Sequence, residues 1–281
     1  MSHDAVTTSP GELDLSSPGR MSPRQRANLT RGIQYGILVL VVILVAAKLD
    51  WQSFNDNFLS LEAVRKVGGR VPRALGNTLI YTLCAFILSL SLGLVLALMK
   101  LSQVTVYRWL ATAYIEFFRG LPALMVVFAV GYGVPLALGV KLPNNITLKV
   151  ALALGMVSAA YLAESLRAGI QAVPKGQVEA ARSLGMSHGQ TMVSVVIPQA
   201  IRIVLPPVTN EIILLTKDTS LCYVLGLTTA EYELAKQARE VLKEPNGGIT
   251  AFFLIGACYL IITLPLGFLV RRMERSFGKA K

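Results

Sequence analysis

The chain has 281 residues, of which 53% are hydrophobic and only 15% are Asp, Glu, Lys or Arg. Soluble globular domains are about a quarter charged, so this composition excludes an ordinary soluble protein and indicates an integral membrane protein. The formal net charge of +11 does not indicate nucleic-acid binding. The basic residues lie mainly beside apolar runs, as the positive-inside rule describes, and no nucleic-acid-binding motif accompanies them.

The N-terminal region is expected to precede the membrane core. Residues 1–32 are rich in Ser, Thr, Pro and Gly, which predicts a disordered cytoplasmic tail. The apolar run Ile33–Ala47 resembles a signal peptide, but the long polar lead-in and the membrane segments that follow favour an uncleaved span. Aromatic and apolar residues recur at helical spacing from Trp51 to Leu61, which predicts a short helix in the membrane interface. Residues 33–76 are therefore expected to form an extra N-terminal span and an interfacial helix.

Further apolar segments have roughly the 20 residues that a helix needs to cross a hydrocarbon core about 30 Å thick. They are Asn77–Met99, Leu121–Val140, Leu148–Leu166, Ala200–Leu215 and Ile249–Val270. Pro198 and the Pro206–Pro207 pair are expected to interrupt the chain before and within the fifth span. The sequence therefore predicts an all-α integral membrane protein with a bundle of about six transmembrane helices. Its core is residues 77–275, and a basic cytoplasmic tail, 276–281, follows.

Six spans put both termini on one side of the membrane, and the basic residues beside the first and last spans predict that this side is cytoplasmic. Lys100, which follows the second span, agrees with this orientation. A group of basic residues falls on the outer side and conflicts with the rule: Arg65, Lys66, Arg70 and Arg73. We name these four residues the outer basic cluster.

A polar loop, residues 174–197, separates the fourth and fifth spans. Pro174 suits the first turn of a helix, and Gly185 lies where a helix commonly ends in a left-handed residue. Ser187 and Gln190 then have the spacing of a capping box, which begins a second helix. The loop is therefore expected to be two short helices joined by a glycine hinge. From the pattern alone, it is either a lever that another surface grips or an ordinary connection between spans.

Specific motifs connect the chain to a known family. Glu179–Ala181, followed by Gly185, resembles the EAA loop of ABC importer permeases. The stretch Gly176–Met186 is similar to the polar amino acid branch, which comprises the histidine, glutamine, glutamate and arginine permeases. Further stretches are similar to the same branch: Tyr114–Pro122, Tyr161–Glu164, Arg167–Ile170 and Lys217–Leu221. The resemblance covers about residues 75–275, and it departs from the family pattern at Leu121, where threonine is usual.

The resemblance implies a mechanism and a set of partners. Two permease subunits, alike or related, would pair around a central pathway in the lipid of the bacterial cytoplasmic (inner) membrane, and a binding protein outside would deliver the substrate. The EAA helices would dock into two copies of a separate ATPase subunit, whose closure on ATP would swing the spans from inward-open to outward-open. The family core has five spans, so the first span here is an addition. The residues implied to couple the ATPase to the permease are Glu179, Ala180, Ala181, Arg182, Gly185 and Met186.

The sequence offers no nucleotide site or catalytic set. A P-loop reads GxxxxGK[ST], and the only Gly-Lys pair, Gly278-Lys279, is followed by Ala280. ATP and Mg²⁺ are therefore expected on the partner ATPase, and no cofactor is expected on this chain. The histidines are His3 and His188 alone, and no nucleophile–base arrangement accompanies them. The three cysteines fit no metal site.

Ionisable side chains inside spans are costly, so they usually face a cavity or a partner. Glu164 lies in the fourth span one turn before Arg167, and the two are expected to pair, either structurally or beside a pathway. Polar residues of the fourth and fifth spans are predicted to line or gate the pathway and to bind an amino acid's carboxylate and ammonium, with pure packing as the alternative. The predicted pathway residues are Glu164, Asn210, Glu211, Lys217, Asp218, Thr219 and Ser220.

The sequence alone leaves two classes of function open. The first is the permease subunit of an ABC importer for polar amino acids, glutamate and glutamine included, or for another small solute. In that class the outer basic cluster would steer an acidic amino acid or dock an acidic binding protein. The second is an ATP-independent channel or scaffold, which would need no docking loop and would copurify with no ATPase. Which amino acid is carried, and whether the permease pairs with a copy of itself, both stay open.

Overall fold

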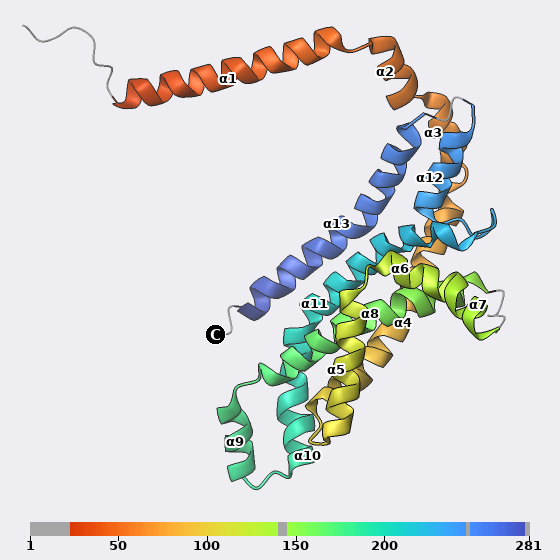
Figure 1. Ribbon diagram of the computed structural model, residues 1–281. Coiled ribbons are helices and arrows are strands. Elements are labelled where there is room, and N and C mark those ends of the chain that lie inside the picture. The colour runs from red at the N-terminus through yellow and green to blue at the C-terminus, as the bar shows by residue number, and fades with distance from the viewer. Residues whose placement is uncertain (1–22, 140–144, 246–247, 279–281) are drawn as a thin grey trace, which may run out of the picture. The chain divides into compact units, whose positions relative to one another are not determined.

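A computed structural model describes residues 23–139, 145–245 and 248–278 (Figure 1). Every regular element in these ranges is a helix, which confirms the expected all-α class. The chain divides into two compact units, Met1–Phe54 and Asn55–Lys281.

The first unit consists mainly of α1 (Pro23–Lys48), and α2 (Trp51–Phe58) begins within it. The segment Ala27–Lys48 is long and apolar enough to cross a membrane, so a helix of spanning length is present where an additional span was expected. The expected tail lies outside the described residues up to residue 22. From Pro23 onward the tail expectation is wrong, because proline suits the first position of a helix and the Arg, Gln and Ala residues that follow are compatible with one.

Long helices give the second unit its frame: α4 (Val71–Leu101), α8 (Ile146–Gln171), α11 (Ile197–Asp218) and α13 (Thr250–Gly278). Two of them, α4 and α8, contain the expected second and fourth spans and extend beyond both ends of the apolar run. α11 contains the expected fifth span. α13 begins one residue after the start of the expected sixth span, Ile249–Val270, and extends beyond its end. Hydropathy therefore located these spans correctly but placed most of their ends too close together.

Glycines bring α4 and α8 into close contact. A Cβ added at Gly93 would lie 3.1 Å from the backbone oxygen of Ala159, and one added at Gly155 would lie 3.1 Å from the backbone oxygen of Ala85. Because lipid tails are as apolar as leucine, membrane helices associate largely through close van der Waals packing, which small residues permit. The two helices pack against each other along much of their length.

Replacing Gly93 with Leu is expected to destabilise this helix pair, since overpacking a tight contact costs about 1–3 kcal/mol. We expect a lower midpoint of thermal unfolding for the detergent-purified protein. Gly76→Leu, on the same helix, is the matched control because no atom lies within 4 Å of a Cβ added there. Unfolding midpoints that are the same for Gly93→Leu, Gly76→Leu and the unmodified protein would contradict the close packing.

The expected third span, Leu121–Val140, corresponds to helical structure over Ala123–Leu138. The prediction did not include α5 (Thr105–Gly120), which meets the segment Ala123–Leu138 at an angle of 105°. That segment is made of α6 (Ala123–Phe128), the π turn η1 (Ala129–Gly133) and α7 (Val134–Leu138). Pro122 lacks a backbone N–H, and it forces Leu121 into an extended conformation (φ −102°, ψ 139°), so α5 ends there. With this bent pair counted as one span, the described residues hold six candidate spans, which is consistent with the expected count.

The fifth span is longer than expected and is not interrupted. α10 (His188–Thr191), the π turn η2 (Met192–Val196), α11 and the 3-10 turn η3 (Thr219–Leu225) follow one another as one candidate span, His188–Leu225. We name this segment the long rod.

The prolines of the long rod do not break it, so both expected interruptions are wrong. Pro198 lies in the first turn of α11, directly after the π turn in which the Ile197 N–H donates to the Met192 carbonyl. Pro206 and Pro207 lie inside α11. Membrane helices tolerate prolines because neighbouring helices, Ser/Thr side chains and local π adjustments satisfy the freed backbone groups.

A further helix, α12 (Leu234–Lys243), was not predicted, because it lies in the polar stretch between the fifth and sixth spans. Glu233 caps it by accepting two backbone N–H groups at 2.6 Å. Burial raises the pKa of the Glu233 carboxyl, and these two hydrogen bonds oppose that rise. α12 packs against α3 (Leu61–Gly68) and α13 through its buried residues Leu234, Ala238 and Val241. In Figure 1, α3 and α12 lie at the opposite end of the second unit from α9 (Lys175–Ser183) and α10.

Candidate functional sites

The loop between the fourth and fifth spans forms the two predicted helices, α9 and α10. α9 begins one residue after Pro174, and a Schellman motif ends it. The Gly185 N–H donates to the Arg182 carbonyl (3.0 Å), and the Met186 N–H donates to the Ala181 carbonyl (3.2 Å). Gly185 has a φ of +84°, a left-handed conformation that glycine adopts readily. The predicted glycine hinge is therefore confirmed.

The start of α10 is fixed by side chains. Ser187 and Gln190 form the predicted capping box: the Gln190 N–H donates to Ser187 Oγ (3.2 Å), and the Ser187 N–H donates to Gln190 Oε1 (2.8 Å). Arg182 Nη1 also donates to the Met186 carbonyl (2.7 Å), which ties α9 to the hinge. The hinge is thus a turn defined by backbone and side-chain hydrogen bonds. We name residues 174–197 the coupling loop.

The coupling residues implied by the motif differ in exposure. Glu179, Ala180 and Arg182 are exposed, whereas Ala181 is buried and faces the rest of the protein. Of the two alanines, only Ala180 is therefore accessible to another surface. The sequence reading did not single out Leu184, which is 85% exposed beside the hinge. Its place directly before the hinge glycine is the signal that would have identified it.

A cavity of about 350 Å³ lies between α8, the long rod and the turn that precedes α6. Its polar side chains are Ser158 and Tyr161 from α8, and Glu211 and Asp218 from the long rod. Ser158 Oγ donates a hydrogen bond to Glu211 Oε1 (2.6 Å). Glu211 and Asp218 are seven residues apart, which places them on one face of the helix. Two of the predicted pathway residues thus line the same cavity, which we name the inner cavity.

The bent third span also contributes to the inner cavity. Leu121–Ala123, the turn between α5 and α6, lies in its wall. At the end of α5, the Arg119 guanidinium lies 5.6 Å from the centre of the Tyr161 ring, within the range of a cation–π contact. Sequence reasoning missed Ser158 as a lining residue because a lone serine in a membrane helix commonly bonds to its own backbone.

Glu164 does not line the inner cavity. Its carboxylate is held by Lys100 Nζ (2.5 Å) and by Arg167 Nη2 (2.8 Å). The expected pairing with Arg167 is therefore confirmed, and the additional link to Lys100 connects the end of α4 to α8. This arrangement is a structural ion-pair network between two neighbouring helices.

The remaining predicted pathway residues also lie outside the lining of the inner cavity. They are Asn210, Lys217, Thr219 and Ser220. Asn210 and Lys217 are exposed on one face of α11, while Thr219 is fully buried and donates to the Thr216 carbonyl (2.7 Å). Within the described residues, the inner cavity is therefore defined by the two carboxylates of the long rod and not by the whole predicted set.

Comparisons with known proteins agree with this architecture. Residues 89–279 match the family model described as "Binding-protein-dependent transport system inner membrane component". The chain is 37% identical to the probable glutamine ABC transporter permease protein GlnM of Bacillus subtilis, over 72% of the chain and 92% of that protein. It is 34% identical to the arginine transport system permease protein ArtQ of the same organism, over 73% of the chain and 91% of that protein.

A solved structure, the crystal structure of an amino acid ABC transporter with histidines, matches with a TM-score of 0.66 and 34% identity. The match covers 78% of the chain and 98% of the solved one. The helical frame, the coupling loop and the motifs within it are therefore those of a multi-pass protein of the inner membrane. The chain belongs to the family of binding-protein-dependent transport system inner membrane components, the permease subunits of ABC importers.

Proposed function

We propose that this chain is the translocation subunit of an ABC importer for polar amino acids, driven by ATP that separate subunits hydrolyse. The observation that carries the proposal is the long rod. It runs for 38 residues, begins inside the coupling loop and holds both Glu211 and Asp218, which line the inner cavity. A displacement of α10 therefore moves the two carboxylates through one helical segment, and α9 acts on that segment through the turn at Gly185.

The inner cavity supports an amino acid as the transported solute. Its volume of about 350 Å³ lies within the range of roughly 300–1,000 Å³ that is typical of small-molecule sites. Glu211 and Asp218 offer carboxylates to an ammonium or a cationic side chain, and no cationic residue is part of the described lining. This lining favours a neutral or basic amino acid over glutamate, because the side chain of glutamate would add a further negative charge beside these two carboxylates. Relatives named for glutamine and arginine agree with that choice, whereas a relative named for glutamate and aspartate, 35% identical, does not.

The partners follow from the family. A pair of permease subunits, either two copies of this chain or this chain with a related one, encloses the pathway, and the exposed α11 face with Asn210 and Lys217 is available to it. Two copies of an ATPase subunit grip the coupling loops and bind ATP and Mg²⁺, so this chain needs no cofactor. An extracytoplasmic binding protein delivers the amino acid. The coupling loop and both termini are cytoplasmic, and α3 and α12 lie at the outer end.

Reconstitution tests the proposal directly. The chain, coexpressed with its genomic neighbours, is expected to copurify with an ATPase. In proteoliposomes it is expected to take up labelled glutamine or arginine only when ATP is inside and a loaded binding protein is outside. Uptake that continues with a non-hydrolysable nucleotide would support a channel and contradict the proposal.

The orientation can be checked in the same vesicles. Leu184→Cys places a thiol at an exposed position of the coupling loop. We expect a membrane-impermeant maleimide to label it in inverted vesicles and not in right-side-out ones, with the unmodified protein as the background control. Labelling from the outer side alone would place the coupling loop outside and remove the proposed contact with an ATPase.

A further inference from the structure

The C-terminal end of α13 carries three arginines close together: Arg271, Arg272 and Arg275. They follow Phe268 by three, four and seven residues, and side chains at these spacings share one side of a helix. The four side chains line a cavity of about 290 Å³. We name it the basic pocket.

The three arginines of the basic pocket have no counter-ion within the described ranges. All three are exposed, and none forms a hydrogen bond or an ion pair with a described residue. Glu274 is the single acidic residue of α13, and it does not line the pocket. It points about 100° around the helix from Arg275, since an α-helix has 3.6 residues per turn. The pocket therefore presents cations alone.

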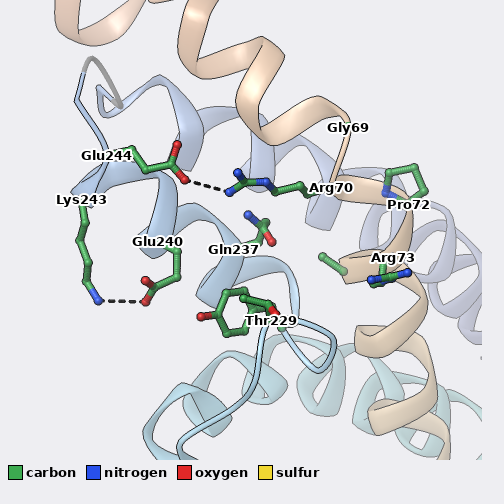
Figure 2. Close-up of a pocket in the computed structure, with 11 residues that line it drawn as sticks. Gly69, Arg70, Pro72, Arg73, Thr229, Gln237, Glu240, Lys243 and Glu244 are labelled. Atoms are coloured by element: carbon green, nitrogen blue, oxygen red, sulfur yellow. Dashed lines mark hydrogen bonds and ion pairs between the residues drawn. The ribbon is translucent and has the colours of Figure 1, made fainter.

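A larger cavity shows a different arrangement of charge. It has a volume of about 900 Å³ and lies between the α3–α4 corner and α12 (Figure 2). Four of the five charged side chains that line it form ion pairs: Arg70 with Glu244, and Lys243 with Glu240, both at 2.9 Å. Because most of its charge is neutralised within the chain, that cavity attracts an outside anion less than the basic pocket does.

The side of α13 that carries the basic pocket is apolar toward the middle of the span. Ile261, Leu264 and Phe268 follow one another at helical spacing, and their side chains are exposed by 73%, 59% and 61%. The segment Thr250–Ser276 is long and apolar enough to cross a membrane, so this side is available to lipid chains. The basic pocket thus lies where an apolar surface meets a group of cations.

The arginine side chains lean toward that apolar surface. In a helix, each Cα–Cβ bond tilts toward the N-terminus, which at this end of α13 is the direction of the membrane centre. Arg271 follows this rule, because its Nη1 lies 3.5 Å from the position that a Cβ on Gly267 would take, one turn earlier in the helix. Its guanidinium is therefore near the level of Phe268.

An anionic phospholipid matches both parts of this surface. Guanidinium groups bind phosphate oxygens through paired, charge-assisted hydrogen bonds, and acyl chains cover exposed apolar side chains. A free phosphate would leave Ile261, Leu264 and Phe268 uncovered. An acidic protein surface in the aqueous phase would reach the arginines but not the apolar residues deeper in the span. A zwitterionic lipid brings a cation of its own, which the three arginines repel.

We propose that the basic pocket binds the headgroup of an anionic phospholipid, whose phosphate accepts hydrogen bonds from the arginines while an acyl chain lies along Phe268, Leu264 and Ile261. The site needs only a bilayer, so it does not depend on the proposed transport activity. α13 packs against α11, and the bound lipid therefore anchors the helix beside the long rod.

The test measures lipid binding to the purified full-length chain, with the partner subunits that copurify, by native mass spectrometry. The probes are phosphatidylglycerol and phosphatidylcholine with the same acyl chains. The unmodified protein is expected to bind phosphatidylglycerol more tightly. The double variant Arg272→Gln, Arg275→Gln is expected to raise the Kd for phosphatidylglycerol about 10- to 30-fold, since each basic residue at an anionic membrane surface contributes about fivefold. Its Kd for phosphatidylcholine is expected to stay within about twofold of the unmodified value, as for exposed charges generally.

The matched control makes the same change of charge at the end of another span. Arg24 and Arg31 are exposed on α1, which holds the candidate span Ala27–Lys48. The double variant Arg24→Gln, Arg31→Gln is expected to change the Kd for phosphatidylglycerol by less than about twofold. An equal loss in both double variants would show a general attraction between basic residues and anionic lipid, and would overturn the proposal.

The apolar half of the site has its own variant. Phe268→Ser keeps every charge and removes the aromatic ring, and it is expected to weaken the binding of phosphatidylglycerol several-fold. Glycerol 3-phosphate, which has the phosphate without the chains, is expected not to displace the lipid at equal concentration. Displacement at equal concentration would identify a site for free anions and contradict a lipid site.

The remaining outcomes concern folding and protein partners. Substitutions of exposed arginines usually change stability little, so the midpoint of thermal unfolding in detergent without phosphatidylglycerol is expected to stay the same. A Kd for phosphatidylglycerol that is equal in the unmodified protein and in Arg272→Gln, Arg275→Gln would overturn the proposal. If that variant instead loses a copurifying subunit while it still binds the lipid, the arginines contact a protein and the proposal is wrong.

Discussion

Gly185→Leu is expected to lower ATP-driven uptake about tenfold or more while the protein still inserts and assembles. The hinge has a φ of +84°, and a non-glycine residue in the left-handed region costs about 1–3 kcal/mol. That strain equals about a 5- to 150-fold shift in a conformational equilibrium, and it falls on the turn that joins α9 to the long rod. The measurement is the initial rate of uptake in proteoliposomes, normalised to the amount of assembled complex.

The control for this variant lies a few residues away. Gly189 is on α10, its φ is not in the left-handed region, and no atom lies within 4 Å of a Cβ added there. Gly189→Leu is therefore expected to transport far better than Gly185→Leu. Normal uptake by Gly185→Leu would mean that the coupling loop does not act as a lever.

Glu179→Lys, which reverses an exposed charge on α9, is expected to weaken copurification of the ATPase and lower uptake.

The double variant Glu211→Gln, Asp218→Asn is expected to lower transport as strongly as Gly185→Leu does. It removes both charges from the inner cavity and keeps their shapes, and the amide carbonyl that replaces the Glu211 carboxylate can still accept the hydrogen bond from Ser158 Oγ. Hydrogen bonds to charged groups contribute about 1.5–3 kcal/mol each, so the loss of even one should weaken solute binding about 10-fold or more. Uptake at saturating loaded binding protein measures the effect on translocation.

Two further variants make the result specific. Glu116→Gln removes an exposed carboxylate on α5 that is not part of the cavity lining, and it should leave uptake within about twofold, as for exposed charges generally. Lys217→Gln tests the wider set of predicted pathway residues, and we expect it to have less effect than the double variant because Lys217 does not line the cavity. Uptake by the double variant at the rate of Glu116→Gln would exclude the inner cavity from the pathway.

The parts of the fold that depend on local chemistry were predictable from the sequence. Apolar runs located α4, α8, α11 and α13, because a segment that must cross lipid has to be long, apolar and helical. The glycine hinge and the capping box of the coupling loop were also correct, since both depend on residues a few positions apart. The ionisable residues Glu211 and Asp218 stood out because a charge in a span is costly unless it faces a cavity or a partner.

The parts that depend on long-range packing were not predictable. The 105° bend between α5 and α6 follows from Pro122, but hydropathy assigned a span only from Leu121 onward and left α5 out of it. The opposite error occurred at Pro198 and Pro206, where π geometry and the membrane surroundings keep the long rod helical. α12 has too few apolar residues for a span, so its burial against α3 and α13 is visible only in three dimensions. The same holds for the link between Lys100 and Glu164.

The glycine contacts between α4 and α8 determine register as well as distance. A slide of one turn, about 5.4 Å, would bring Ser89 or Ala97 to the place of Gly93, and both carry a Cβ that would crowd the Ala159 backbone. Close packing therefore fixes the alignment of α4 and α8. In the proposed importer we expect the long rod to move relative to this fixed pair. The hydrogen bond from Ser158 on α8 to Glu211 on the long rod would then break or re-form beside the transported solute.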